Sequence, residues 1–226
     1  MIYPWYIFFG IAPSIIWLLI FLKKDSHPES NRMILKIFFY GALATIPTAL
    51  IEVGIGSFPI GEILYFMVGV ALVEEVFKYL VVKKRVVESS EFDEPVDAML
   101  YMIIAALGFA AVENILNMFL LLKPQYFFDA FLVGGIRFVG ATFLHALCSG
   151  LVGYYLALSF LYTKRRFKMI AKGLLIAVLL HGFYDLSIIK IEGMAKFIIP
   201  IIILIFLSIF VSLGFQKVKK LKSICK

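Results

Sequence analysis

Two neighbouring carboxylates and a lysine interrupt an apolar stretch of the chain. Glu74, Glu75 and Lys78 lie within Val70–Val82, which is otherwise apolar enough to lie in a bilayer. On an insertion scale each charge at the centre of a membrane helix costs about 2.5–3.5 kcal/mol, so three cost about 8–10 kcal/mol. The apolar residues of the segment return only about 4–7 kcal/mol. The segment therefore needs partners for its charges, a water-filled cavity or protonated glutamates.

Helical geometry supplies one of these partners. At about 100° per residue, the side chain of Lys78 projects between those of Glu74 and Glu75 on one helix face. An internal ion pair that only makes insertion tolerable is one interpretation. A catalytic or transport site is the other, because ionisable groups inside a membrane are functional candidates. One carboxylate would suffice to neutralise one lysine, so the presence of two favours a functional site.

Polar residues also interrupt three later apolar stretches. Glu113 and Asn114 lie in one stretch, His145 in the next, and His181 with Asp185 in the third. Counted at about 1.5 Å per residue from the ends of their segments, all fall close to the bilayer midplane. The predicted helices therefore place carboxylates and imidazoles at the same depth in the membrane.

Each of these residues also has a structural interpretation when it is taken alone. Asp185 follows His181 by four residues, and a carboxylate on the same helix face can fix the tautomer of an imidazole or simply join two helices. A lone His145 can bond a backbone carbonyl. Arg137, on the neighbouring segment, is a suitable counter-ion for Glu113, which favours a structural role for that pair.

As a set, the glutamates and histidines can perform hydrolysis. One carboxylate accepts a proton from water while imidazoles steer or protonate the leaving group. The same side chains can bind Zn²⁺, which takes histidine nitrogen and glutamate oxygen and keeps one position for water. The zinc signature HExxH does not occur in the sequence. The residues alone leave both mechanisms open.

The composition is that of an integral membrane protein. Of the 226 residues, 62% are hydrophobic and 16% are charged, and no polar stretch is long enough to fold separately. We therefore expect residues 1–226 to form a single membrane domain. The net charge of +7 does not indicate a nucleic-acid partner, because the basic residues cluster just outside the apolar segments.

The hydropathy pattern predicts an all-α, polytopic transmembrane helix bundle. Basic residues cluster in the first, third and fifth loops and in the C-terminal tail, and the positive-inside rule then predicts an N-out, C-in topology. Seven apolar segments are expected to span the bilayer, at Ile2–Leu22, Met33–Val53, Pro59–Val82, Val96–Leu122, Ala130–Tyr162, Ile170–Ile189 and Met194–Phe215.

Several separated motifs together resemble the PrsW family of bacterial intramembrane proteases, which are related to the CAAX prenyl endopeptidases and the ABI bacteriocin-immunity proteins. They occur in the family's order and cover nearly the whole chain. They are IAP at Ile11–Pro13, Glu74–Glu75–x–x–Lys78, FDEPVDAMLY followed by GFAAVEN at Gly108–Asn114, FLHAL around His145, and HGFYD at His181–Asp185.

The resemblance implies a multi-pass protease of the bacterial plasma membrane. Its substrate would be a single-pass anti-sigma factor, cut on the extracytoplasmic side to begin the release of a sigma factor under envelope stress. Glu74 would activate the water and Glu75 would orient a histidine, while His145 and His181 complete the catalytic centre. The supporting residues are Lys78, Glu113, Asn114 and Asp185.

The sequence differs from the related families at a few positions, and the use of a metal is a separate question. We favour a glutamate–histidine centre without a metal; if zinc is used, its ligands are Glu75, His145 and His181. Ala98 and Met102 stand where the family pattern has glycines, and Asp185 replaces an asparagine common in the prenyl endopeptidases. An ionised aspartate cannot donate a hydrogen bond, so it cannot act as an asparagine-type oxyanion donor.

Two alternatives use the same buried carboxylates without proteolysis. The first is a non-catalytic membrane protein of the ABI type. The second is a proton-linked transporter, in which the carboxylates form a relay. Transporters commonly carry inverted repeats with broken spans in matching halves, and the sequence has no such symmetry. Prenyl-protein processing, the activity of the related endopeptidases, is a third and weaker possibility.

Overall fold

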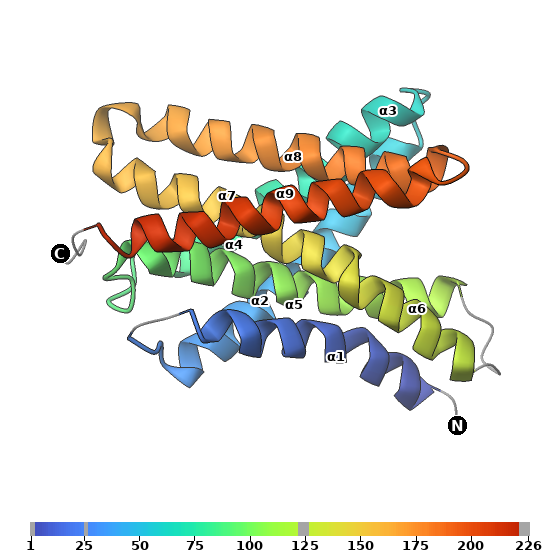
Figure 1. Cartoon of the computed structure of the whole chain (residues 1–226), viewed down its shortest axis with the longest axis horizontal. Helices are drawn as coiled ribbons and strands as arrows, with labels where there is room; N and C mark the ends of the chain where they lie inside the picture. Colours follow the sequence, from blue (N-terminus) through green and yellow to red (C-terminus); the bar gives the residue numbers. More distant parts are fainter. Residues whose placement is uncertain (1–2, 25–26, 122–126, 222–226) are drawn as a thin grey trace.

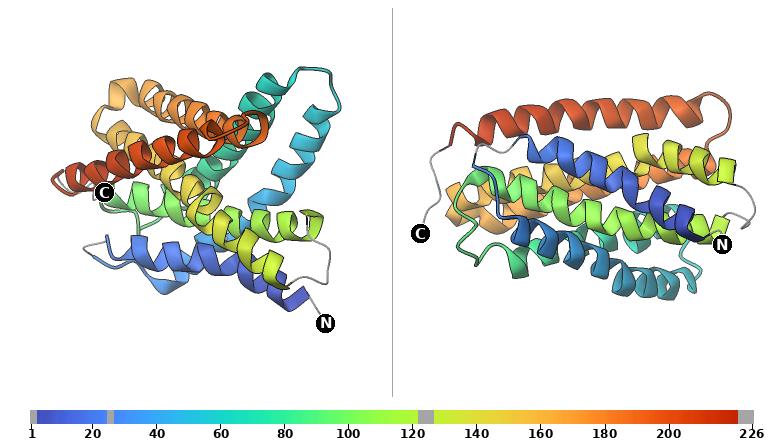
Figure 2. Two further views of the ribbon diagram at one scale, coloured as in Figure 1. Left: turned by 45° about the vertical axis from the view of Figure 1, so that its right-hand side comes forward. Right: turned by 90° about the horizontal axis from the view of Figure 1, so that it is seen from below.

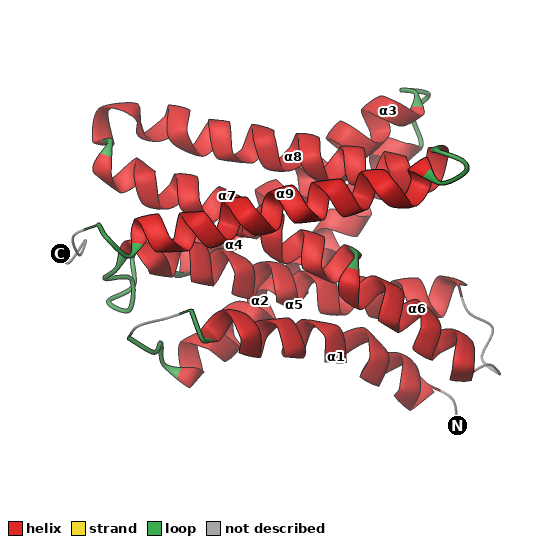
Figure 3. Ribbon diagram, in the orientation of Figure 1, coloured by secondary structure: helices red, strands yellow, loops and turns green. Residues whose placement is uncertain are grey.

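The computed structural model describes residues 3–24, 27–121 and 127–221, and within them the chain forms helices and no strand (Figures 1 and 3). The all-α prediction is therefore confirmed. The predicted segment ends Ile2 and Leu122 lie outside the described residues. The elements are α1 (Tyr3–Leu22), α2 (Asn31–Gly56), α3 (Glu62–Leu64), η1 (Tyr65–Leu72), α4 (Val73–Arg85), α5 (Pro95–Leu121), α6 (Phe127–Val139), α7 (Ala141–Leu161), η2 (Thr163–Arg165), α8 (Arg166–Lys190) and α9 (Ala195–Val218).

Six stretches of the described chain are helical, long and apolar enough to cross a membrane. They are Pro4–Leu22, Asn31–Gly56, Pro95–Leu120, Gly135–Leu161, Thr163–Lys190 and Ala195–Val218. They correspond to six of the seven predicted segments. The remaining segment, Pro59–Val82, is also helical from Glu62 onward, but it is divided among α3, η1 and α4 and carries the charged residues discussed above. The N-out, C-in orientation stays a prediction.

The long helices run roughly along one direction, with α1 and α8 at opposite edges in Figure 1 and with α9 and α2 at opposite edges in the right-hand view of Figure 2. Helix α5 packs against α1, α2 and α7, and its residues from Val96 to Ala111 are buried throughout. It is therefore the central helix of the bundle.

Glycines bring α5 into direct backbone contact with its neighbours. A Cβ added at Gly41 of α2 would lie 2.0 Å from the carbonyl oxygen of Ala105, and one at Gly108 of α5 would lie 1.9 Å from that of Phe38. In a bilayer, where lipid tails are as apolar as leucine, such close approach is what holds helices together. These contacts fix α5 against α2.

The fifth predicted segment is kinked rather than straight. Ala130–Tyr162 is divided at Gly140 between α6 and α7, although backbone hydrogen bonds continue on both sides of this residue. The hydroxyl of Tyr184 would lie 2.5 Å from a Cβ at position 140, so any other residue there would require the tyrosine side chain to move. The indole of Trp17 donates a 2.9 Å hydrogen bond to the carbonyl of Phe138, which satisfies an acceptor beside the kink.

The π-helix η1 leads directly into the glutamate pair of α4. Such wide turns are rare and occur frequently at functional sites. Helix η1 packs on α8 at Gly182, where an added Cβ would lie 2.5 Å from the sulfur of Met67. This close contact brings α8, and with it the neighbouring His181, against the beginning of α4.

Candidate active site

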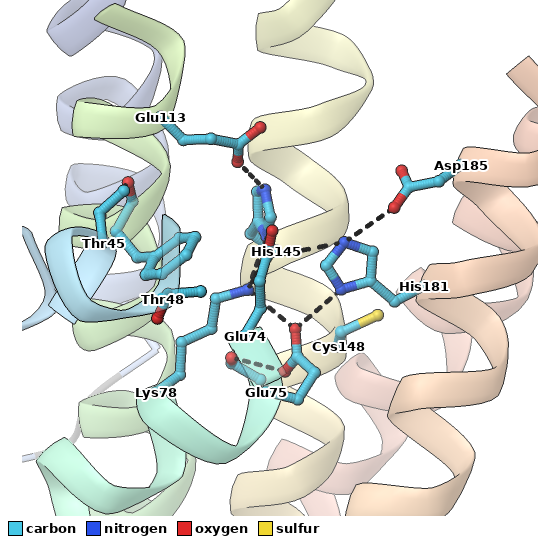
Figure 4. A network of polar contacts seen from close by, with 12 residues as sticks. Thr45, Thr48, Glu74, Glu75, Lys78, Glu113, His145, Cys148, His181 and Asp185 are labelled. Carbon is cyan, nitrogen blue, oxygen red and sulfur yellow. Dashed lines mark hydrogen bonds and ion pairs between the residues drawn. The ribbon is translucent and has the colours of Figure 1, made fainter. Parts of the chain in front are cut away.

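Helices α4, α5, α7 and α8 bring their polar residues together in one buried cluster (Figure 4). Glu74, Glu75, His145 and His181 each offer one ligand atom, and these atoms all lie within 4.8 Å of one another. Each of the four side chains is at least nine-tenths buried. The structure therefore joins the four residues that the sequence indicates as a centre, although they come from three different helices.

Lys78 lies in the middle of this cluster and is fully buried. Its Nζ donates to Glu74 Oε2 and Glu75 Oε1, each over 2.9 Å, and lies 2.8 Å from Nδ1 of His145. The two contacts within α4 follow from the i, i+4 and i, i+3 spacings, as the sequence predicts. The contact with His145 of α7 does not follow from any spacing within one helix.

The neighbours of His145 determine its tautomer. Because a lysine ammonium can only donate, Nδ1 of His145 must accept from Lys78. Nε2 then carries the proton, and it donates to Oε2 of Glu113 over 2.6 Å. The imidazole is thus neutral, with the lone pair of Nδ1 directed into the cluster and a carboxylate behind the opposite nitrogen.

Glu113 and Asn114 of α5 form hydrogen bonds with residues of α6 and α7 next to the cluster. The guanidinium of Arg137 donates to Glu113 Oε1 over 2.8 Å, so the predicted pairing is present in the structure. Asn114 accepts from Arg137 and donates to the hydroxyl of Thr142 over 2.8 Å and to the carbonyl of Gly10. Asn114 therefore connects helices, whereas Glu113 contacts a residue of the cluster.

Glu75 has both carboxylate oxygens engaged. Oε1 accepts from Lys78 and from Nδ1 of His181, the latter over 3.0 Å, and Oε2 accepts from the hydroxyl of Ser149 over 3.3 Å. On the other side of the ring, Nε2 of His181 lies 3.5 Å from Asp185. Glu75 thus holds the imidazole of His181 in place, which is the type of contact that the PrsW resemblance implies for this glutamate.

Glu74 differs from its neighbour. Within the described part of the chain, its hydrogen bond with Lys78 uses Oε2 alone, and its distances to the histidines, 3.6 Å to His145 and 3.8 Å to His181, are longer than hydrogen bonds. Glu74 is therefore the glutamate with an oxygen left to accept a proton.

The donor set suits a divalent transition metal. Imidazole nitrogens and carboxylate oxygens are ligands of Zn²⁺, and in such sites the second nitrogen of a ligating histidine usually donates to a carboxylate or carbonyl. His145 already makes this outer contact with Glu113. Glu75, His145 and His181, the zinc ligands expected from the sequence, can therefore hold the ion, and Glu74 lies within 4.8 Å of their ligand atoms.

Two neighbours of the cluster were not found from the sequence. Ser149 follows His145 by four residues, so a shared helix face was the available signal. The ring of Phe109 on α5 lies with its centroid 4.5 Å from Nζ of Lys78, where it stabilises the ammonium by a cation–π contact. An aromatic residue in an apolar helix gives no signal of such a role.

Comparison with known proteins gives one consistent answer. Residues 29–213 match the family model described as PrsW family intramembrane metalloprotease. Relatives named Protease PrsW include one from Oceanobacillus iheyensis, 30% identical over 88% of this chain and 89% of that protein. One from Bacillus subtilis is 30% identical over 95% of this chain and 94% of that protein. One from Geobacillus kaustophilus is 32% identical over 78% of this chain and 76% of that protein. No solved structure matches the chain.

Proposed function

The chain belongs to the PrsW family of intramembrane metalloproteases, and on that premise we propose that it hydrolyses a peptide bond of a single-pass membrane protein at the cluster around Glu74 and Glu75. The protein is a peptidase and a multi-pass membrane protein of bacteria. The observation that carries the proposal is the convergence of four ligand atoms, from Glu74, Glu75, His145 and His181, within 4.8 Å.

Glu74 is the general base of the proposed reaction. Its free oxygen accepts a proton from water while the water oxygen forms a bond to the scissile carbonyl carbon. A buried carboxylate is suited to this step, because the site excludes bulk water and keeps the base in one orientation. The carbon–nitrogen bond then breaks and the leaving nitrogen takes up a proton.

In a centre without metal, His181 is the residue that we assign to protonating the leaving group. Glu75 holds its Nδ1, and its Nε2 faces both Glu74 at 3.8 Å and Asp185 at 3.5 Å. From this position the imidazole can pass a proton to the departing nitrogen, and Asp185 stabilises the imidazolium that exists before the transfer. His145, kept neutral by its two partners, directs a lone pair into the centre.

The family description and the donor set favour a metal-dependent centre over the metal-free one expected from the sequence. Glu75, His145 and His181 would hold the ion, for which Zn²⁺ is the best match in ligand type, which leaves one position for water. Glu74 would stay outside the ligand set and, because a ligating His181 has no proton to give, would also pass the proton taken from water to the leaving nitrogen. When bound, such an ion polarises a carbonyl oxygen and makes water a stronger nucleophile. The proton transfers remain the work of the side chains described above.

The proposed substrate is an anti-sigma factor with one transmembrane segment, cut on its extracytoplasmic side. The resemblance of the motifs to the PrsW family supports this substrate class. The burial of the centre among apolar helices supports a substrate that reaches it from within the bilayer. Cleavage would be the first step in releasing a sigma factor during envelope stress.

Co-expression with tagged single-pass anti-sigma factors tests the proposal. The wild-type protein is expected to produce a truncated substrate, and Glu74→Gln to leave it intact at equal abundance of the protease. Glu62→Gln is the matched control, because this exposed residue of α3 pairs with Lys190 at the surface. A truncated product in the Glu74→Gln strain would contradict the assigned base. Proton flux through liposomes, dependent on Glu74 and without any cleavage, would favour the transporter alternative.

A further inference from the structure

The ammonium of Lys78 has its full set of hydrogen bonds within the cluster. A lysine has three N–H donors. The three acceptors are Glu74 Oε2 at 2.9 Å, Glu75 Oε1 at 2.9 Å and His145 Nδ1 at 2.8 Å. These acceptors belong to three of the four residues whose ligand atoms lie within 4.8 Å of one another. The ammonium therefore lies where the lone pairs of the ligand set converge.

A metal ion and this ammonium cannot use the same lone pairs. Nδ1 of His145 has one lone pair, and it is directed at Lys78. Two positive charges in a buried site would also repel each other strongly, since little water screens them. A divalent cation can thus be bound only after Nζ of Lys78 has moved away from its three acceptors.

The structure offers the displaced ammonium another environment. The ring of Phe109 is 4.5 Å from Nζ and can hold a cation on its face. Figure 4 shows Thr45 and Thr48 on the same side of the site as Lys78, across from His181. Their hydroxyl oxygens are further acceptors, and the flexible stem of a lysine allows its head to change partners.

We propose that Lys78 is an internal cation that takes the place of the metal ion in the metal-free protein and sets how tightly the ion binds. This inference rests on the metal-dependent form of the proposed function. In the metal-free protein the ammonium pairs with both glutamates, so the bundle stays folded without the ion. When the ion enters, Lys78 gives up its three acceptors, and the affinity of the site is lowered by the loss of these bonds.

The direction in which a Lys78 substitution changes the metal affinity distinguishes a competing cation from a residue that supports the metal ligands. Removal of a partner that supports metal ligands lowers metal affinity by about 10- to 100-fold. Removal of a competing cation must raise it. We therefore expect Lys78→Met to bind Zn²⁺ at least about tenfold more tightly than the wild type, in the reverse direction to the loss seen for supporting residues.

The experiment is a Zn²⁺ titration of the purified, detergent-solubilised full chain against a chromophoric chelator. Lys78→Met and Lys78→Gln are compared with the wild type and with Lys190→Met, which removes an exposed lysine that pairs with Glu62. The expected result is tighter binding in both Lys78 variants and unchanged binding in Lys190→Met. Equal or weaker binding in the Lys78 variants would overturn the inference.

Thermal unfolding provides a second readout if a Lys78 variant is unstable without the ion. The proposal expects Zn²⁺ to raise the melting temperature of Lys78→Met by more than that of the wild type, because the ion then replaces the missing charge. A variant that unfolds at the same low temperature with and without Zn²⁺ would show a purely structural lysine and contradict the proposal.

Failure of this inference and failure of the proposed function give different results. Cleavage of a single-pass substrate is measured on the same preparations. If the wild type cleaves, Glu74→Gln does not, and no variant binds Zn²⁺, the peptidase assignment stands while the role of Lys78 is overturned. If Lys78→Met binds Zn²⁺ more tightly but the wild type cleaves nothing, the role of Lys78 is supported and the assigned substrate is wrong.

Discussion

Nε2 of His145 donates to Oε2 of Glu113 over 2.6 Å, so that a carboxylate of α5 fixes the ring of a histidine on α7. The opposite nitrogen of the ring faces the glutamate pair of α4 through Lys78. One imidazole therefore connects the cluster to the ion pair of Glu113 and Arg137. The position of His145 therefore depends on residues outside the cluster of Glu74, Glu75, His145 and His181.

Glu113→Gln is expected to lower the rate of substrate cleavage by about 10- to 100-fold without preventing folding. The amide is a weaker acceptor for the Nε2–H of His145 and leaves Arg137 without its carboxylate partner. The cleavage rate of a tagged substrate, normalised to the amount of protease in the membrane, measures this effect. A rate equal to that of the Glu62→Gln control would mean that Glu113 does not position the histidine.

Glu75→Gln is expected to destabilise the protein more than Glu74→Gln does. Glu75 accepts hydrogen bonds from Lys78, His181 and Ser149, whereas Glu74 bonds only Lys78 among the described residues. Loss of one partner of a buried ion pair costs up to about 3–5 kcal/mol. Denaturant unfolding in detergent compares the two variants, and the reverse order of stabilities would contradict the assigned hydrogen bonds.

Gly108→Ala is expected to prevent the bundle from assembling, while Gly54→Ala is expected to be tolerated. The added methyl at position 108 would lie 1.9 Å from a backbone oxygen of α2, which cannot move without the whole helix, whereas at position 54 no atom lies within 4 Å. Overpacking typically costs about 1–3 kcal/mol and more where backbone must shift. The amount of protein in the membrane fraction measures the outcome. Equal accumulation of the two variants would contradict the close contact of α2 and α5.

Removal of the metal is expected to abolish cleavage but not the fold. Chelator treatment of the purified protein should stop substrate cleavage, and added Zn²⁺ should restore it. The helical content and the melting temperature should fall only slightly, because Lys78 remains paired with both glutamates. Full activity after the bound metal has been removed, verified by elemental analysis, would instead favour the metal-free centre.

Much of the architecture could be predicted from the sequence because a bilayer penalises charge. The cost of placing Glu74, Glu75 and Lys78 among apolar residues identified α4 as exceptional before any contact was known. The same reasoning selected His145 and His181, which the structure brings together with the glutamates. The apolar lengths likewise predicted the six helices that are long and apolar enough to cross a membrane, whereas the seventh predicted span, Pro59–Val82, is not among them.

Other features have no signature in spacing or hydropathy. The residues next to Gly140, Val139 and Ala141, are apolar, so the hydropathy pattern gave no sign of the kink between α6 and α7. The contact of Lys78 with His145 and that of Ser149 with Glu75 join different helices, and a single sequence specifies neither the rotation nor the depth of one helix relative to another. The hydrogen bonds of Asn114 could not be predicted from the sequence for the same reason, because its partners lie on α1, α6 and α7.

The most direct test of the account uses the purified protein in liposomes together with a purified, tagged single-pass substrate. With no other protein present, the wild type is expected to release a fragment of defined length, while Glu74→Gln, loaded with Zn²⁺ and folded to the same extent, releases none. Release of the same fragment at the same rate by Glu74→Gln would contradict the assignment of the cluster as the hydrolytic centre.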